Sequence, residues 1–443
     1  ANASGAISGW LDQYLIDTIG VHLEVVQATN ERMQASLASG DLTDLVNFNF
    51  WKDVESAVKG NMLVCLDDNM DSLPHATANI STALQFMRDE HSFGTGKVYA
   101  IPDNIGDYML PYESGVSSNF RWDIYQAIGA PQAKTLEDFL PILKQMQDYY
   151  PQTADGQKTY GISLFSEWDG GTRFYSTSTF MALLGQYNGL EKYGLSWDVR
   201  TNETAGLLDS DGVFVRILKF LYQANQLGIL DPDSITQTYT SQAAKVTAGA
   251  ILGFTNAESF NADANVNGDP PVGYRTVVFD EFYTVTQSDY PFGAGSPIAI
   301  GKNTKDLDAC LRFIDLLVDN DAMMIYNNGP QGVLWDLDSN GKPYATDMYW
   351  EYLKDTKMEL PGGGRLGTTG LMFKPLLRPT TINSTYGIPL NMSYWSDVIK
   401  KNNTNKLNTA WTEFYKYESP IKYIEDKKMG SQRPLANTFL MTA

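Results

Sequence analysis

The chain has 443 residues, of which 43% are hydrophobic, and a formal net charge of -19 at pH 7. This length and apolar content are typical of a folded globular protein of about two domains. The negative charge repels phosphates and anionic lipid head groups, which disfavours nucleic acid and membrane surfaces as direct partners.

Two helix and strand pairs open the chain. Apolar residues at helical spacing predict a helix over 7–19, stopped by Gly20, and the β-branched run at 21–27 predicts a strand. A second helix ended by Gly40 precedes a strand over 42–50. This alternation is typical of a parallel α/β layer.

Polar and aromatic residues follow the second of these strands. In parallel sheets, ligands bind beyond the carboxyl ends of the strands, so this position predicts ligand contact. A buried aromatic helix start is the alternative for each residue taken singly. The candidates are Asn47, Phe48, Asn49, Trp51 and Lys52.

The middle of the chain repeats the pattern. Thr135 and Asp138 form a variant of the capping box at the start of a helix that Pro151 ends. A strand over 158–165 then leads into a glycine-rich loop that holds Trp168, Asp169 and Arg173. A later strand, in the segment KVTAGAILGFTNAESF, ends at Phe254, Thr255 and Asn256. The segment 295–329 predicts a strand, a turn and one amphipathic helix ended by Gly329.

The segment DLDSNGKPYATD, residues 336–347, has the acidic spacing of a calcium-binding EF-hand loop. Pro343, however, stands at the eighth position and lacks the amide hydrogen needed there, and Asp347 is short for the twelfth position. The flanking residues suggest strands rather than helices. We therefore predict a hairpin turn with Asn340 and Gly341 at positive φ, and no metal.

Catalytic and cofactor motifs are absent from the sequence. Cys65 and Cys310 have no CxxC or Cys/His spacing, which argues against zinc, and whether they pair stays open. Three histidines show no HxxxH spacing, and no GxxxxGK[ST] or GxGxxG motif occurs. We expect no cofactor.

Five segments in order resemble a known family: GKVYAIP, RWDIYQAIGAPQAKTLEDFLPILKQMQ, TYGIS, DACLRFIDLLVDNDAMMIYNNG and GPQGVLWDLDSNGKPYATD. Their order is similar to that of the family 1 type extracellular solute-binding proteins of carbohydrate ABC importers, most closely the lipoprotein branch common in Gram-positive bacteria. The resemblance covers almost the whole chain. It departs at the ends: members have a strand before the first helix and a closing helical segment, and we expect both to be missing. A loop near TYGIS that carries an acidic calcium-type run in that branch has one Asp here.

The resemblance implies a two-lobed α/β periplasmic-binding-protein-like fold, each lobe a mixed sheet flanked by helices, with the ligand cleft between the lobes. We expect lobe I to comprise 1–106 and 291–330, and lobe II to comprise 107–290 and 331–443. The chain would cross between them near 102–112, 290 and 330.

The resemblance also implies roles for single residues. Phe48 matches the position of a stacking aromatic residue, with Trp51 and Lys52 following it. Trp168 and Asp169 match a tip in the second lobe, and Phe254 and Asn256 match another stacking position. A structural role is the stronger expectation for the remaining candidates, Asn104, Asp107, Trp335 and Arg365.

The implied function is binding of a neutral oligosaccharide and its delivery to an ABC transporter permease, without enzymatic activity. We expect a monomer outside the cell, tethered as a lipoprotein through an N-terminal segment that has been removed. Two alternatives stay open. A glycoside hydrolase also needs aromatic residues and paired carboxylates in a cleft, and a glycan-binding surface protein without a transport role would share the fold.

Overall fold

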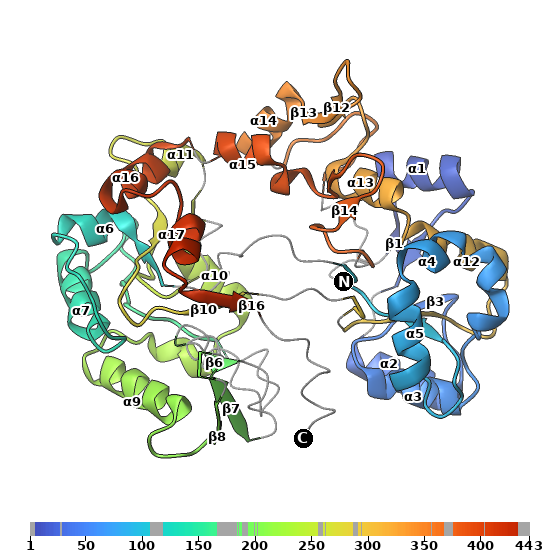
Figure 1. Ribbon diagram of the computed structural model, residues 1–443, viewed down its shortest axis with the longest axis horizontal. Coiled ribbons are helices and arrows are strands. Elements are labelled where there is room, and N and C mark those ends of the chain that lie inside the picture. The colour runs from blue at the N-terminus through green and yellow to red at the C-terminus, as the bar shows by residue number, and fades with distance from the viewer. Residues whose placement is uncertain are drawn as a thin grey trace. The chain divides into compact units, whose positions relative to one another are not determined.

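The computed structural model divides the chain into two compact units (Figure 1). Unit 1 comprises Ala1–Met109 and Asp289–Lys401, and unit 2 comprises Leu110–Ser288 and Asn402–Ala443. Both units mix helices with small sheets, which confirms the predicted α/β class. The structure describes residues 5–26, 29–106, 118–165, 184, 186–187, 194–198, 200–201, 203–255, 260–261, 263–286, 291–293, 295–355, 357–366, 375–402 and 404–432.

The main sheet of unit 1 has three strands with β11 (Ile298–Ile300) in the centre. β3 (Leu45–Asn47) pairs with one edge of β11 and β4 (Ala100–Ile101) with the other. Both pairs are antiparallel. The prediction of a parallel layer is therefore wrong for these strands. β3 and β4 do run the same way, but a strand from much later in the chain lies between them and runs against both.

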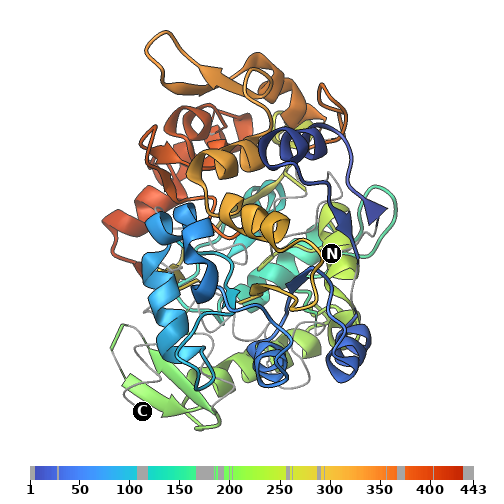
Figure 2. The same cartoon turned by 90° about the vertical axis from the view of Figure 1, so that its right-hand side faces the viewer.

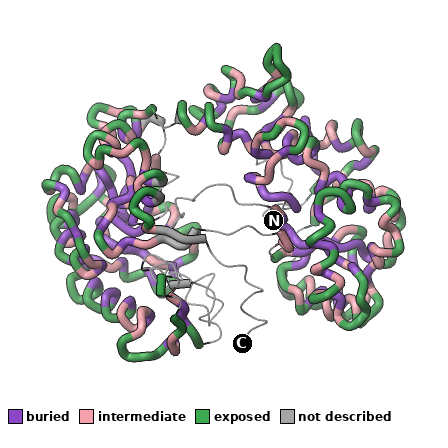
Figure 3. Tube along the Cα trace, viewed as in Figure 1, coloured by how far each residue is buried: buried purple, intermediate pink, exposed green. Residues whose placement is uncertain are grey.

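Helices cover both faces of this sheet. Side chains alternate along a strand, so Ile298 and Ile300 face the larger core cluster, whereas Ala299 faces the smaller one. Figure 2 shows α4 beside α12, and Figure 3 shows buried, intermediate and exposed residues interleaved along the chain of unit 1. Helices on the larger cluster include α1 (Trp10–Ile19), α4 (Pro74–Asn79), α5 (Ser81–Glu90) and α12 (Leu307–Leu316), and those on the smaller one are α2 (Asn30–Ser39) and α3 (Trp51–Lys59).

The predicted ends of the first two helices are confirmed. α1 ends before Gly20 (φ 68°) and α2 ends before Gly40 (φ 71°), both in the left-handed conformation that favours glycine. The side chain of Thr29 accepts the backbone N–H of Arg32 and caps the start of α2. A short strand does precede the first helix, contrary to expectation: β1 (Gly5–Ala6) pairs antiparallel with β2 (Glu24–Val25).

Residues 331–401 belong to unit 1, whereas the sequence-based division placed them in the second lobe. The physical reason is burial. Leu334, Trp335 and Trp395 lie in the same core cluster as Trp10 and Leu15 of α1. The elements of this segment are β12 (Trp335–Leu337), β13 (Pro343–Ala345), α14 (Asp347–Lys354), β14 (Ile382–Asn383), β15 (Ile388–Pro389), a 3-10 helix at Met392–Tyr394 and α15 (Ser396–Asn402).

Two predicted elements differ in their bounds. The single helix expected before Gly329 is two helices, α12 and α13 (Asn320–Asn328), because the side chain of Asp319 accepts the N–H of Asp321 and starts a new helix. The segment KVTA at 245–248, predicted as the start of a strand, lies mostly in α10 (Tyr239–Thr247).

The core of unit 2 packs around α7 (Phe139–Tyr149) and α9 (Val213–Gln226). Asp138 Oδ2 accepts the N–H of Thr135 at 2.9 Å, but Thr135 is not the N-cap that was predicted, because α7 begins at Phe139 and Asp138 takes the N-cap position. The predicted end of the helix before Pro151 is confirmed. Further pairs are β5 (Asn119–Arg121) with β9 (Tyr274–Thr276), the sheet of β6 (Gln186–Tyr187), β7 (Leu195–Asp198) and β8 (Glu203–Gly206), and β10 (Thr284–Thr286) with β16 (Gly430–Gln432). Unit 2 also contains the helices α6 (Trp122–Ala127), α11 (Asp263–Val266), α16 (Lys406–Tyr415) and α17 (Pro420–Asp426), and a 3-10 helix at Pro232–Ile235. In unit 1, a 3-10 helix covers Asp67–Ser72.

Within the described ranges, no helix has the length and apolar character that a bilayer crossing requires.

Candidate functional site

Three chain segments meet at one end of the unit 1 sheet, where β3 and β4 finish and β11 begins. We call this end the sheet edge. Because β11 is antiparallel to both neighbours, the carboxyl ends of β3 and β4 lie beside the start of β11. The N–H of Phe48 donates to Pro297 O at 2.8 Å, and the N–H of Asp103 donates to Gly295 O at 3.2 Å. The side chain of Asn47 donates to Ser296 O at 3.2 Å. The predicted candidates Asn47 and Asn104 therefore lie at a single sheet edge, and Asn49, Trp51 and Lys52 follow Asn47 directly in the chain.

Gly293 allows the third segment to approach closely. Its φ is 76°, and a Cβ at this position would lie 2.5 Å from Pro102 Cγ and 3.0 Å from Asp103 O. A side chain is excluded on both grounds. Asn104, two residues after Pro102, also has a positive φ of 54°, which asparagine tolerates better than most residues.

An aromatic cluster lies behind this edge. Trp51 stacks on His91 with ring centroids 4.0 Å apart and an angle of 23° between the planes. Phe86 contacts both His91 (5.6 Å) and Phe292 (4.7 Å). Burial lowers the pKa of His91, so the ring under Trp51 is neutral at pH 7. One face of Trp51 is thus occupied by protein, and its indole is held in a fixed orientation.

Phe48 does not fit the stacking role that the resemblance implied. Its side chain is 0% exposed and packs in the smaller core cluster, so neither ring face can meet a ligand in this structure. Its neighbour Phe50 is 40% exposed, with the ammonium group of Lys52 located 5.2 Å from its ring centre. Sequence reasoning missed Phe50. Strand alternation gave no signal for it, because Phe48 and Phe50 have the same parity and would share a face if the strand continued. β3 ends at Asn47, so the alternation does not apply to Phe50.

A second strand-end arrangement lies in unit 2. Tyr160 bridges Ile251 and Ile162 bridges Leu230, both in parallel, so the segments 158–165 and 250–255 end on the same side. The described ends of these two segments, Phe165 and Thr255, therefore lie on the same side of unit 2. Phe254 is 2% exposed at a φ of 50° and packs edge-on against Phe120 and Phe139, which makes it a core residue in this structure. Trp168, Asp169, Arg173 and Asn256 lie outside the described residues, as does Asp107 in unit 1.

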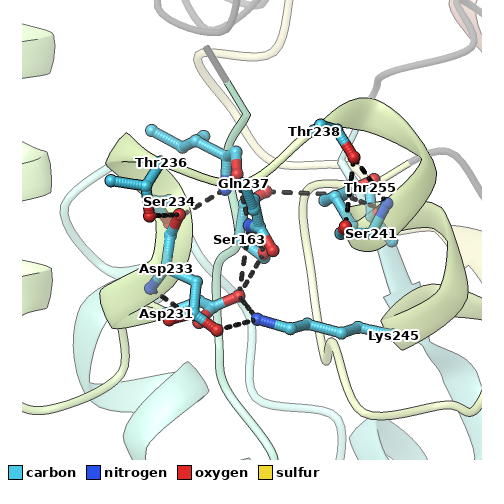
Figure 4. A network of polar contacts seen from close by, with 12 residues as sticks. Ser163, Asp231, Asp233, Ser234, Thr236, Gln237, Thr238, Ser241, Lys245 and Thr255 are labelled. Carbon is cyan, nitrogen blue, oxygen red and sulfur yellow. Dashed lines mark hydrogen bonds and ion pairs between the residues drawn. The ribbon is translucent and has the colours of Figure 1, made fainter. Parts of the chain in front are cut away.

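A buried polar network that sequence reasoning missed supports this end of unit 2 (Figure 4). Asp231 Oδ2 accepts hydrogen bonds from Ser163 Oγ (2.7 Å) and Lys245 Nζ (2.7 Å), and the Gln237 amide donates to Ser163 Oγ at 2.8 Å. The Gln237 amide also donates to Leu164 O at 2.5 Å, which fixes the end of the 158–165 segment. The spacing of these residues along the sequence gives no signal, because their closeness depends on the parallel bridge at Ile162.

Electrostatics keep this network ionised. Burial alone would raise the pKa of Asp231, but the hydrogen bonds from Lys245, Ser163 and the backbone N–H of Asp233 outweigh it and hold the pKa below its ordinary value. Burial likewise acts to lower the pKa of Lys245, and its hydrogen bonds to Asp231 and Asp233 reverse this and raise it. The network is therefore charged, and it supports the end of the 158–165 segment.

The other weaker candidates have structural surroundings. Trp335 is buried and donates its indole N–H to Gly329 O at 2.9 Å. Arg365 is half-buried near Tyr352. Burial raises the pKa of the Tyr352 phenol, and the charge of Arg365 partly offsets this increase. Neither lies at the sheet edge formed by β3, β11 and β4.

The predicted hairpin at 336–347 is confirmed, but the expected positive φ at Asn340 is wrong, since of the two turn residues only Gly341 has one. β12 and β13 pair antiparallel, with Leu337 opposite Pro343, and Gly341 has a φ of 75°. Asp338 Oδ1 accepts the N–H groups of Lys342 (2.9 Å) and Asn340 (2.8 Å), which lower its pKa. Its carboxylate is therefore part of the turn. No group of three or more potential metal ligands occurs among the residues that the structure describes, and Cys65 and Cys310 are both free thiols.

Comparison with solved structures identifies the fold. The chain matches the alginate-binding protein AlgQ2 without calcium ion at a TM-score of 0.58 and 15% identity, over 89% of this chain and 79% of that one. It matches the S. pneumoniae ABC-transporter substrate binding protein FusA, as an EF-hand mutant in complex with fructo-nystose, at a TM-score of 0.57 and 14% identity, over 95% and 91%. The chain has the fold of an ABC-transporter solute-binding protein.

A further structure with this solute-binding fold is an HMO binding, ABC-transporter associated protein from Bifidobacterium longum infantis, which matches at a TM-score of 0.51 and 15% identity, over 88% and 80%. No protein-family model and no curated protein matches the chain. The likeness is therefore one of fold, carried by the arrangement of elements rather than by sequence identity.

Proposed function

We propose that this protein binds a neutral oligosaccharide and delivers it to the membrane permease of an ABC importer. The observation that carries the proposal is the likeness of fold to FusA and AlgQ2 over about nine-tenths of the chain. The edge of the unit 1 sheet adds chemical support, because polar and aromatic side chains gather where such a ligand would bind.

A sugar ring presents apolar C–H faces and a rim of hydroxyl groups, so its binding site needs aromatic platforms with amides or charges beside them. Phe50 and Trp51 can supply the platforms, and Asn47, Asn49 and Lys52 can supply the polar contacts. Asn104 adds a second amide at the same sheet edge. Trp168, Asp169, Arg173, Asn256 and Asp107 stay predictions for the same ligand.

The charge of the chain selects among sugars. A net charge of -19 repels anionic saccharides and leaves neutral ones unaffected. The solved FusA complexes contain fructo-nystose and kestose, and AlgQ2 is named for alginate. For this chain we propose the neutral class. We also propose that the protein is a monomeric extracellular lipoprotein and not an enzyme.

A thermal-shift screen of the full chain tests the proposal. Neutral fructo-, malto- and gluco-oligosaccharides form one arm and alginate oligosaccharides form the matched anionic arm. A neutral ligand at about 100 times its Kd should add roughly 2.7 kcal/mol of stability. Stabilisation by the anionic arm alone contradicts the proposed ligand class, and release of reducing ends from a bound sugar contradicts the non-enzymatic role.

A further inference from the structure

The imidazole of His91 lies behind the indole of Trp51, the aromatic platform proposed for the sugar. Trp51 is the first residue of α3, and His91 directly follows α5. The N–H of His91 donates to Met87 O at 3.1 Å, so the end of α5 fixes the backbone from which the imidazole extends. The two rings stack with centroids 4.0 Å apart. A sugar that stacks on Trp51 therefore meets the opposite face of the indole.

Ring contacts hold the imidazole in this place. Besides the stack on Trp51, His91 contacts Phe86 and Phe93 edge-on, with ring centroids 5.6 and 6.3 Å away. Among the residues that the structure describes, its side chain makes no hydrogen bond and no ion pair. The imidazole therefore supports Trp51 as a flat ring, and a phenyl ring at this position can give the same support.

The charged side chains of the surrounding elements have other contacts. Lys52 lies over the ring of Phe50, and Glu90 is exposed. The segment 291–293, which supplies Phe292 to the cluster, contains no charged residue. Burial accordingly lowers the pKa of His91. The remaining charged groups of α3, α5 and the segment 92–99 pair as follows: Asp53 with Gln34, Glu55 with Lys59, Arg88 with Asp67, Asp89 with Gln85, and Lys97 with Asp68.

A proton on His91 would weaken a sugar contact on the far face of Trp51. The C–H groups of a sugar carry a small positive charge and meet the negative face of the indole. A cation on the other face is attracted by the same ring electrons, so an imidazolium competes with the sugar for them. A buried cation is also stabilised by moving toward water, which would remove the support behind the indole. Both effects have the same sign.

We propose that His91 is a positioning residue for sugar binding: its neutral imidazole holds the Trp51 platform, and protonation of the imidazole lowers the affinity for the sugar. This inference deepens the proposed function and rests on it. The loss is limited to what one aromatic platform contributes, about two- to tenfold in affinity. The protein therefore holds a neutral sugar less tightly in acidic surroundings, although the sugar itself does not titrate.

The fluorescence of Trp51 tests the stack without any sugar. An imidazolium in contact with an indole quenches its emission, whereas a neutral imidazole does so much less. The emission of the full chain minus that of Trp51→Phe isolates Trp51 from the remaining tryptophans. It should fall with decreasing pH, with a midpoint below the ordinary histidine value of 6.5, and this step should be absent in His91→Phe. A missing step in the wild type, or a step that persists in His91→Phe, overturns the inference.

Calorimetric titration with kestose, maltotriose and cellotriose then measures the affinity on either side of that midpoint. The wild type should bind about two- to tenfold more weakly below the midpoint than above it. His91→Phe keeps a ring behind Trp51, so it should bind as the wild type does above the midpoint and show no pH dependence. His91→Leu keeps an apolar side chain without a ring, so its affinity should be about two- to tenfold lower at both pH values.

Two controls separate this role from a general effect on the fold. His91→Leu should cause no further loss in the Trp51→Ala variant, because it acts through the indole. His22→Gln and His75→Gln replace the other two histidines, which bond to carboxylates, and should leave the pH dependence unchanged.

The outcomes distinguish this inference from the proposed function. Equal wild-type affinity on both sides of the midpoint, or weak binding by His91→Phe above it, overturns the role of His91 while sugar binding stands. If none of the three sugars binds the wild type, the proposed function fails and the role of His91 in affinity fails with it, whatever the fluorescence of Trp51 shows.

Discussion

The buried pair of Asp231 and Lys245 in unit 2 allows a quantitative prediction for the variant Lys245→Met. The side chain of Asp231 is 0% exposed and that of Lys245 is 17% exposed, with 2.7 Å between Oδ2 and Nζ. Removal of one partner from a buried ion pair costs about 3–5 kcal/mol, since the other charge stays buried without compensation. Asp231 keeps the hydrogen bonds from Ser163 and Gln237, so we expect the lower end, about 3 kcal/mol.

Scanning calorimetry measures this effect. For a unit of this size, about 3 kcal/mol corresponds to a fall in Tm of roughly 6–12 °C. The shift should affect the transition of unit 2 and leave that of unit 1 unchanged, so unit 1 serves as an internal reference. Lys219→Met, at an exposed position of α9, is the matched control and should change the Tm little. A fall of less than about 2 °C for Lys245→Met would refute the reasoning.

The same variant has a predicted pH dependence. The folded-state pKa of Asp231 lies below its ordinary value of 3.8, so its stabilising contribution is present above that pH and is lost as pH falls through the folded pKa. The pKa of Lys245 is raised above 10.5, so its contribution is present below that pH and is lost as pH rises through the folded pKa. The difference in Tm between wild type and variant should therefore be constant near neutral pH and shrink below pH 3.8.

Three further predictions concern unit 1. Trp51→Ala should weaken sugar binding about two- to tenfold by calorimetry, since a stacked aromatic ring contributes about 0.5–1.5 kcal/mol, and an equal loss in the half-buried control Trp350→Ala would contradict a direct role. Phe48→Ala should destabilise unit 1 by about 3–5 kcal/mol in urea unfolding, because the ring is fully buried, with sugar affinity retained where the unit is folded. Calcium or EDTA should leave the Tm unchanged, because Asp338 already accepts two backbone N–H groups in the hairpin, and a loss of stability in EDTA would point to a metal elsewhere in the chain.

Local signals predicted local structure well. Gly20 and Gly40 end helices because the left-handed conformation favours glycine, and the turn at Asn340 and Gly341 follows from Pro343 and the strand-like flanks. These features depend on a few adjacent residues, so a single sequence contains the information.

Long-range pairing could not be predicted in this way. The order β3-β11-β4 depends on a strand that no local pattern links to its neighbours, and the helix and strand alternation therefore led to the wrong expectation of a parallel layer. The packing of 331–401 with unit 1 is long-range in the same way, since Trp335 and Trp395 lie in one core cluster with Trp10 and Leu15 of α1.

For the candidate site, the sequence located the strand ends but not the direction of each side chain. Asn47, Asn49 and Lys52 are exposed and Trp51 is half-buried, whereas Phe48 turns into the core. A shift of one residue along a strand exchanges the two faces of the sheet. The predicted strand ended at residue 50 and β3 ends at Asn47, so the error in the strand end was larger than one residue.

The central position of β11 also affects how the chain is made. β3 leaves the ribosome about 250 residues, and β4 about 200 residues, before the strand that joins them. At about 5–20 residues per second, these strands wait roughly 10–50 s for their partner. Unit 1 therefore cannot complete its sheet during synthesis of its first 109 residues, and the open strand edges are exposed to aggregation throughout that interval. A cell that makes this protein needs to protect the nascent chain until residue 300 has emerged.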